Sequence, residues 1–98
     1  MSDIIKMEYA LMDDMSKTFS QSVEMLQDTS QQMQEIASKL EDGALLGRGG
    51  DAFSDAIRSK LCPAISRLVE KYEELAKDVK DAKQDMQSAD QDSAGLYN

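Results

Sequence analysis

A glycine-rich span is the first candidate for chemistry in this chain of 98 residues. Residues 47–52, Gly-Arg-Gly-Gly-Asp-Ala, match the G-x-G-x-x-A pattern of dinucleotide-binding turns. That pattern holds a pyrophosphate only where a strand leads into the glycines and a parallel strand follows the helix. Here helical periodicity lies on both sides of the span. It is therefore predicted to be a turn between helices, and no cofactor site is expected.

Carboxylates and nucleophiles are the other candidates, and their spacing does not favour catalysis. Pairs such as Asp13-Asp14 and Glu73-Glu74 are adjacent in sequence, so their side chains diverge on a helix. The chain has no histidine, which leaves its serines without the usual general base and excludes a Cys/His zinc site. The acidic stretch from Asp81 to Asp92 lacks EF-hand spacing. We expect a non-enzymatic protein with no catalytic or metal-binding residues.

Cys62 and the net charge further restrict the kinds of protein that this chain can be. A lone cysteine cannot form an internal disulfide, so Cys62 is interpreted as a small apolar residue near a helix start, with an intermolecular disulfide as the alternative. A net charge of −8 disfavours binding to nucleic acid. No stretch has the roughly 18 apolar residues of a membrane span, and no Sec-type leader is recognisable. We expect synthesis in the cytoplasm, without membrane insertion.

The elements that position these residues are two long helices. Ile5, Met12, Phe19, Leu26, Met33 and Leu40 recur every seven residues, which predicts a helix over about 4–42. The positions three residues after these, which include Met15 and Ile36, are expected to line the same contact with the neighbouring helix. Four further apolar residues widen the stripe, as in a helix that touches two neighbours: Leu11, Val23, Met25 and Ala37. Gly43 is predicted to end this helix in a left-handed conformation.

A turn over about 43–50 and a second helix over about 51–88 complete the predicted domain. Asp51 is a suitable N-cap, and the apolar spacing alternates between four and three residues from Leu61 onward. Pro63 lies inside that pattern and predicts a kink, because it removes a helical hydrogen bond. Residues 89–98 are polar and acidic and are predicted to fray.

The predicted fold class is all-α, with residues 1–98 forming one antiparallel two-helix hairpin that pairs into a four-helix bundle. A hairpin this small buries only one seam, which makes a helical partner plausible. The expected bundle interface consists of the apolar register positions of both helices: Ile5, Met12, Met15, Phe19, Leu26, Met33, Ile36, Leu40, Ile57, Leu61, Ile65, Leu68, Tyr72, Leu75, Val79 and Met86.

The turn carries a family resemblance. Leu45, Gly47 and Phe53 have the spacing of the Trp-x-Gly turn and following aromatic residue in the WXG family, the ESAT-like hairpin proteins of type VII secretion. The chain resembles that family over nearly its full length in architecture, but over about nine residues in motif. It has no Trp, and Leu45 stands at that position. Leu-x-Gly also resembles the signature of LXG toxins, which are type VII effectors.

The resemblance implies a partner or targeting protein of a type VII secretion system. Its partner would be a related small protein or the helical N-terminal domain of an LXG effector. The chain itself would leave the cell by a Sec-independent route, either alone or together with that partner. A secreted homodimer is one alternative, and a cytoplasmic structural coiled-coil protein without an export role is another.

The family's Tyr-x-x-x-Asp/Glu export signal should follow the second helix, and this chain departs from that pattern. Tyr9 and Asp13 fit the letters at the opposite end, whereas Met86 to Asp90 has the right place without the tyrosine. If the family picture holds, a bound partner would supply the signal to the secretion machinery.

Overall fold

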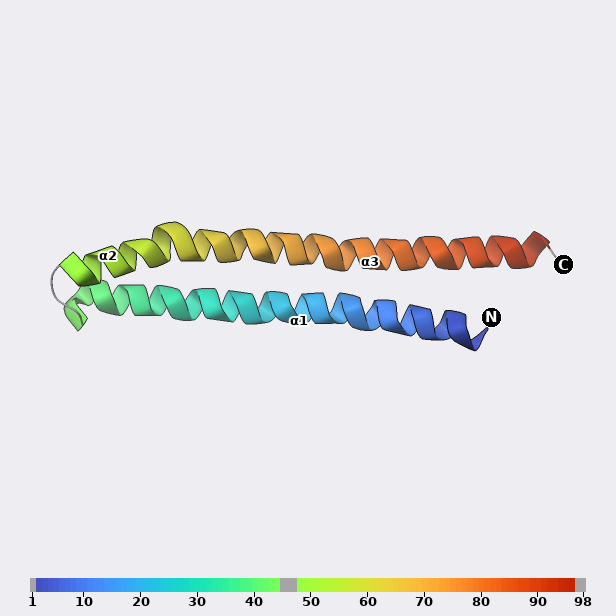
Figure 1. The fold of residues 1–98 in the computed structure, drawn as a ribbon, viewed down its shortest axis with the longest axis horizontal. Coiled ribbons are helices and arrows are strands. Elements are labelled where there is room, and N and C mark those ends of the chain that lie inside the picture. The colour runs from blue at the N-terminus through green and yellow to red at the C-terminus, as the bar shows by residue number, and fades with distance from the viewer. Residues whose placement is uncertain (1, 45–47, 97–98) are drawn as a thin grey trace. The chain divides into compact units, whose positions relative to one another are not determined.

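The computed structural model describes residues 2–44 and 48–96, and all of its regular elements are helical. In chain order they are α1 (Asp3–Lys39), η1 (Leu40–Ala44), α2 (Arg48–Ala56), η2 (Ile57–Leu61) and α3 (Cys62–Leu96). Segment η2 is a π-helical stretch, whereas η1 is interrupted by non-helical backbone at Gly43. The described residues include no strand. Two long helical stretches form a hairpin (Figure 1), which confirms the all-α fold class.

The hairpin divides into two compact units, each built from both long helices. The terminal unit contains residues up to Gln21 and from Tyr72 onward, and the turn unit contains Ser22–Lys71. In each unit a segment of α1 lies beside the returning chain (Figure 1). The two units are described separately below.

The first helix begins with a capping serine. The side chain of Ser2 accepts a hydrogen bond from the backbone N–H of Ile5 at 3.2 Å, which satisfies a donor that the first helical turn leaves unpaired. Asp3 in the first turn and Lys39 in the last turn complement the helix dipole.

Gly43 ends the first helical stretch as the sequence predicts. Its φ of 99° and ψ of 13° lie in the left-handed region, and it is the only described residue with a positive φ. A residue with a Cβ rarely adopts this conformation. The expected helix over about 4–42 is thus divided between α1 and the following η1.

The second helical stretch begins at Arg48, three residues before the predicted N-cap Asp51, which instead lies in the first turn of α2. Glycine has low helix propensity, so the sequence pattern favours a turn at Gly49 and Gly50. In the structure Gly50 is buried, and α2 contacts both η1 and η2. Tertiary packing therefore overrides the local preference.

The irregularity expected near Pro63 takes the form of the π-helical stretch η2. The backbone N–H of Cys62 donates to the carbonyl of Ile57, five residues earlier. Proline has no N–H and crowds the carbonyl four residues before it, here that of Ser59. A wider turn just before Pro63 accommodates both constraints while the helix continues as α3.

Helix α3 continues to Leu96, through residues where the sequence predicts fraying. Apolar burial alone does not account for this extension. In the terminal unit, polar contacts also connect α3 to α1: the Tyr9 hydroxyl donates to Asp90, and Lys83 binds both carboxylate oxygens of Asp13 at 2.8 Å. These contacts stabilise the last turns of α3 against α1.

The buried positions of α1 follow a register that the sequence analysis did not assign. Tyr9, Ser16, Val23 and Ala37 are buried, and they lie four residues after the heptad positions Ile5, Met12, Phe19 and Met33. The sequence predicts the second set of contact positions three residues, not four, after the heptad positions. A tyrosine, a serine and an alanine do not form an apolar repeat, so this register gives little signal in the sequence. Val23 and Ala37 therefore belong to the core of the hairpin, not to a surface for a second neighbour.

Candidate docking surface

The core of each unit is thin and leaves large apolar side chains exposed. In the turn unit the most buried cluster is Ala37, Ile57 and Cys62, with Met33 and Leu40 packed against it. In the terminal unit the Phe19 and Tyr72 rings pack at a centroid distance of 5.5 Å, and Ser16 donates to the carbonyl of Ala76. None of the described side chains is both large and fully buried.

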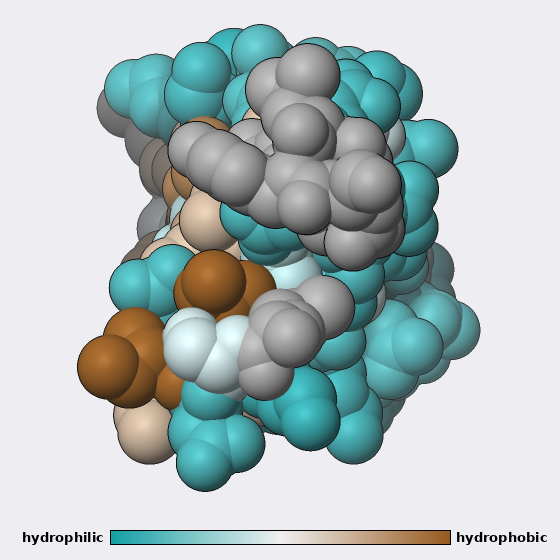
Figure 2. Space-filling view, turned by 90° about the vertical axis from the view of Figure 1, so that its right-hand side faces the viewer, coloured by the Kyte–Doolittle hydropathy of each residue, from teal (hydrophilic) through white to brown (hydrophobic). Residues whose placement is uncertain are grey.

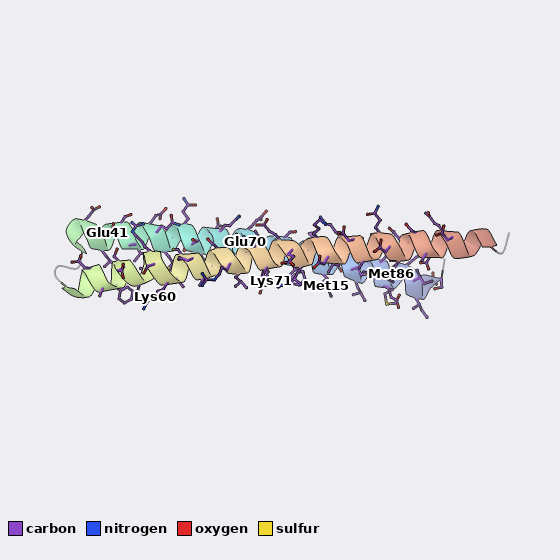
Figure 3. All side chains as sticks on the ribbon, turned by 90° about the horizontal axis from the view of Figure 1, so that it is seen from above. Met15, Glu41, Lys60, Glu70, Lys71 and Met86 are labelled. Carbon is purple, nitrogen blue, oxygen red and sulfur yellow. The ribbon has the colours of Figure 1, made fainter. Side chains whose placement is uncertain are left out.

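The terminal unit has an exposed apolar patch, which we define by its exposed members: Ile4, Met7, Leu11, Met15 and Met86. Met15 is 51% exposed. Figure 3 shows Met15 and Met86, from α1 and α3, at the same edge of this unit. Figure 2 shows apolar side chains gathered on one flank at this end of the molecule, with hydrophilic side chains on the opposite flank.

The turn unit has a second patch of the same kind, formed by exposed apolar residues of α1, α2, η2 and α3: Met25, Ile36, Phe53, Leu61 and Leu68. Met25 is 69% exposed and Leu68 is 41% exposed. These side chains remain in water although each could bury a substantial apolar area against another protein.

Sequence position explains why three patch residues of the turn unit share one flank. Ile36, Leu61 and Leu68 each come directly before a buried residue of the same unit: Ala37, Cys62 and Val69 respectively. Successive residues on a helix are about 100° apart, so all of these side chains lie to the same side of the buried row. In an antiparallel pair of helices, that side is shared by both helices.

The opposite flank of the turn unit is polar. It contains an open groove of about 570 Å³, lined by Gln27, Ser30, Gln31, Gln34, Ile65, Ser66, Val69 and Glu70. Figure 3 places Glu41 and Glu70 at this edge and Lys60 and Lys71 at the other. Only one flank of the turn unit therefore has the character of a protein-docking surface.

The predicted interface residues fall into three groups. Ile57 and Ile65 are buried within the hairpin. A second group is partly buried along the contact between the helices: Ile5, Met12, Phe19, Leu26, Met33, Leu40, Tyr72, Leu75 and Val79. The third group is exposed on the patches: Met15, Ile36, Leu61, Leu68 and Met86. Five buried residues were not predicted to be buried, because their only signal in the sequence is their spacing from the apolar register: Tyr9, Ser16, Ser54, Val69 and Ala76.

Glu41 connects η1 to the chain beyond the turn. Its carboxylate accepts hydrogen bonds from the Arg58 guanidinium at 2.6 Å and from the Ser54 hydroxyl at 2.5 Å. Arg58 also donates to Ser38 at 3.0 Å. The Arg58 hydrogen bond, followed by that from Ser54, lowers the pKa of Glu41 below its ordinary value of 4.5.

This contact predicts a pH-dependent contribution to stability. Folding lowers the pKa of Glu41, so its stabilising effect is complete above about pH 4.5 and is lost as the pH falls through the lower folded-state pKa. Glu41→Gln should therefore lower the thermal midpoint at pH 7 by a few degrees at most, because the pair is solvent-exposed. The difference from the unmodified chain should shrink at pH 3. Circular dichroism melts would measure it, with exposed Glu24→Gln as the control. A difference that is equal at both pH values would contradict the prediction.

Three further observations bear on function. The described residues contain no group of three or more Cys, Asp or Glu side chains placed to hold a metal ion. Cys62 is a buried free thiol, 3.9 Å from the backbone carbonyl oxygen of Ser30. Among the described helices, none has the length and apolarity needed to cross a membrane.

Comparison with known families identifies the hairpin. A family model described as proteins of 100 residues with WXG matches residues 4–91. The chain belongs to the WXG100 family. Neither the curated proteins nor the solved structures gave a match. WXG100 membership associates the chain with type VII secretion and with a non-enzymatic class of small secreted helical proteins.

The turn motif of this WXG100 protein is only partly described. Leu45 and Gly47 lie outside the described residues, so the expected packing of Leu45 stays a prediction. Phe53, the aromatic residue of the motif, is 62% exposed on α2 and contributes to the patch of the turn unit.

Tyr9 and Asp13, which match the WXG100 export signal but lie near the N-terminus, both contact α3. Tyr9 is buried and donates to Asp90, not toward Asp13. That hydrogen bond, burial and the negative charges of Asp90 and Glu8 raise the pKa of Tyr9 to about 12. Lys83 binds Asp13 and lies 6.0 Å from the centre of the Tyr9 ring. Both residues thus have roles within the hairpin that would account for their identity without an export function.

Proposed function

We propose that this WXG100 protein is a non-enzymatic partner or targeting protein of a type VII secretion system. It docks a second helical hairpin on its apolar flank and forms a four-helix bundle. The second hairpin would belong to a related small protein, to the helical N-terminal domain of an LXG effector, or to another copy of the chain. The exposed apolar residues that directly precede buried residues on α1, η2 and α3 carry this proposal.

Exposure of the apolar patches to water is energetically unfavourable. Burial of apolar surface contributes roughly 25 cal/mol per Å², and each large side chain on a patch can contribute 1 kcal/mol or more by this measure. A small two-helix hairpin has a limited core of its own. Docking of a second hairpin would convert the exposed flank into the interior of a bundle.

A pair of substitutions on α3 tests the docking flank. Leu68→Asp should reduce co-purification of the helical partner from the native host by roughly tenfold or more, because it places a charge on the patch. Ser66→Asp adds the same charge to the polar flank and should leave co-purification unchanged. Both variants should keep the helical circular dichroism spectrum, since both side chains are exposed.

Export of the same chain tests the secretion role. The protein should reach the culture medium of the native host, and deletion of the membrane-bound secretion ATPase should retain it in the cells. Retention in both strains would favour the structural coiled-coil alternative, whereas equal export by both strains would contradict the type VII route. If Leu68→Asp and Ser66→Asp weaken partner recovery equally, the proposed docking flank is wrong.

A further inference from the structure

Methionines make up most of the apolar patch on the terminal unit. Met7, Met15 and Met86 are three of its five members, and their side chains are 61%, 51% and 38% exposed. Met7 and Met15 lie on one face of α1, because their spacing is close to two helical turns. Figure 3 shows Met86 of α3 at the same edge as Met15. The thioether sulfurs of this patch are therefore accessible to reagents dissolved in water.

The other sulfur-containing side chains of the described residues differ in burial or in surroundings. Met12 in the terminal unit and Met33 in the turn unit are partly buried, and Met33 packs against the buried cluster of its unit. Met25 is exposed, but it is the only methionine in the patch of the turn unit. The single thiol of the chain, Cys62, is buried and is shielded from a dissolved oxidant. Oxidation of exposed sulfur would therefore change the patch of the terminal unit more than that of the turn unit.

We propose that the patch of the terminal unit is an oxidation-sensitive site, at which hydrogen peroxide converts Met7, Met15 and Met86 to methionine sulfoxide and so prevents docking. The inference rests on the proposed function, because it names a regulation of a surface that docking uses. In each reaction a sulfur lone pair attacks one peroxide oxygen, the O–O bond breaks and an S–O bond forms. The sulfur is oxidised by two electrons, and the second peroxide oxygen leaves as water after proton transfer.

Sulfoxide formation replaces an apolar side chain with a polar one. The sulfoxide oxygen is a hydrogen-bond acceptor, and its burial against an apolar partner without a donor is unfavourable. Three of the five patch residues would change in this way, so the patch would lose most of its apolar character. The buried residues of the terminal unit, among them Tyr9 and Ser16, are not altered. Oxidation should therefore prevent docking while the hairpin stays folded.

The modification is reversible. A methionine sulfoxide reductase with a dithiol reductant restores the thioether: the sulfoxide oxygen leaves as water while the dithiol becomes a disulfide. A docked partner covers the patch, so the oxidant acts on the undocked chain. The patch would thus control the assembly of new complexes, whereas complexes that have already formed are protected.

The first experiment treats the full chain with hydrogen peroxide and follows each methionine by peptide mass spectrometry. Met7, Met15 and Met86 should oxidise roughly fivefold or more faster than Met12 and Met33, because a packed sulfur reacts only when the helices separate. Hydrophobic-interaction chromatography should show earlier elution once the three exposed methionines are oxidised. The helical circular dichroism spectrum should stay unchanged at that point.

The second experiment uses matched variants as bait for the helical partner in extracts of the native host. After peroxide treatment and removal of the peroxide, the unmodified chain should recover roughly tenfold less partner than before treatment. The triple variant Met7→Leu, Met15→Leu and Met86→Leu keeps the patch apolar without sulfur, so its recovery should resist peroxide. Met25→Leu removes an exposed methionine outside the patch and should leave the sensitivity unchanged. Treatment of the oxidised chain with the reductase should restore recovery.

Three results would overturn the inference. Oxidation of Met12 and Met33 as fast as the patch methionines would show that the patch is not selectively accessible. Loss of partner recovery with Leu68→Asp, but none after full oxidation of the patch, would refute the redox control and leave the proposed function intact. Recovery that resists both Leu68→Asp and peroxide would refute the docking flank together with its regulation.

Discussion

Ile57→Ala is expected to lower the free energy of unfolding by about 2–5 kcal/mol, the range for removing a large buried aliphatic side chain. Ile57 is 4% exposed and lies in the most buried cluster of the turn unit, against Ala37 and Cys62. The substitution leaves a cavity where the chain enters η2. The π-helical backbone there is constrained by Pro63 and has little freedom to collapse around it.

Leu61→Ala is the matched control for Ile57→Ala, because both residues belong to η2. Leu61 is 41% exposed and lies on the patch, so its truncation should cost well under half as much in the isolated hairpin. Urea unfolding followed by circular dichroism would compare the two. Equal losses would show that the core is not centred on Ile57.

Gly43→Val is expected to destabilise the hairpin by about 1–3 kcal/mol, because a β-branched residue is strained at a φ of 99°. Gly43→Asn should recover part of this loss, since asparagine tolerates the left-handed region better. The strain is local to the end of η1. The expected loss is therefore in stability, while the helical spectrum below the unfolding transition stays unchanged.

Gly49→Ala is the control for the turn, and it should act in the opposite direction. A Cβ added at Gly49 meets no atom within 4 Å, and the residue lies inside α2. Alanine should therefore be neutral or stabilising by up to about 1 kcal/mol. Thermal melts of the Gly43→Val, Gly43→Asn and Gly49→Ala variants would measure these changes in stability. Loss of stability at Gly49 and none at Gly43 would contradict the assigned backbone.

The hairpin was predictable because its signal is strong and repeated. Six apolar residues at seven-residue intervals from Ile5 to Leu40 predict a long helix, and the glycines that follow it favour a reversal of the chain. The left-handed Gly43 also followed from local chemistry. These features depend on short-range physics that a single sequence contains.

The pairing of the two helices was less predictable. Which residues of α1 are buried, among them Tyr9, Ser16 and Ala37, depends on the residues of the returning chain that lie opposite them. Small or polar residues at these positions allow the helices to pack closely, but they do not form an apolar pattern in the sequence. The early start of α2 similarly depends on the contact with η1. Such choices are tertiary, so the second set of contact positions and the position of the turn could not be read from the periodicity.

The candidate docking flank was predicted only as a set of residues. Met15, Ile36, Leu61 and Leu68 were assigned to a bundle interface, but the sequence did not separate them from residues such as Ile57 and Ile65 that the hairpin itself buries. Exposure in the folded chain makes that separation.

Alkylation of the buried Cys62 thiol can measure how often the surrounding part of the turn unit opens. The sulfur faces the backbone of α1 at Ser30, so an alkylating reagent can reach it only when this part of the turn unit separates. Where reclosing is faster than alkylation, the labelling rate reports the free energy of that opening. With no second cysteine in the chain, each modified molecule records one event at one known place, which makes the strength of the hairpin measurable without denaturant or added probes.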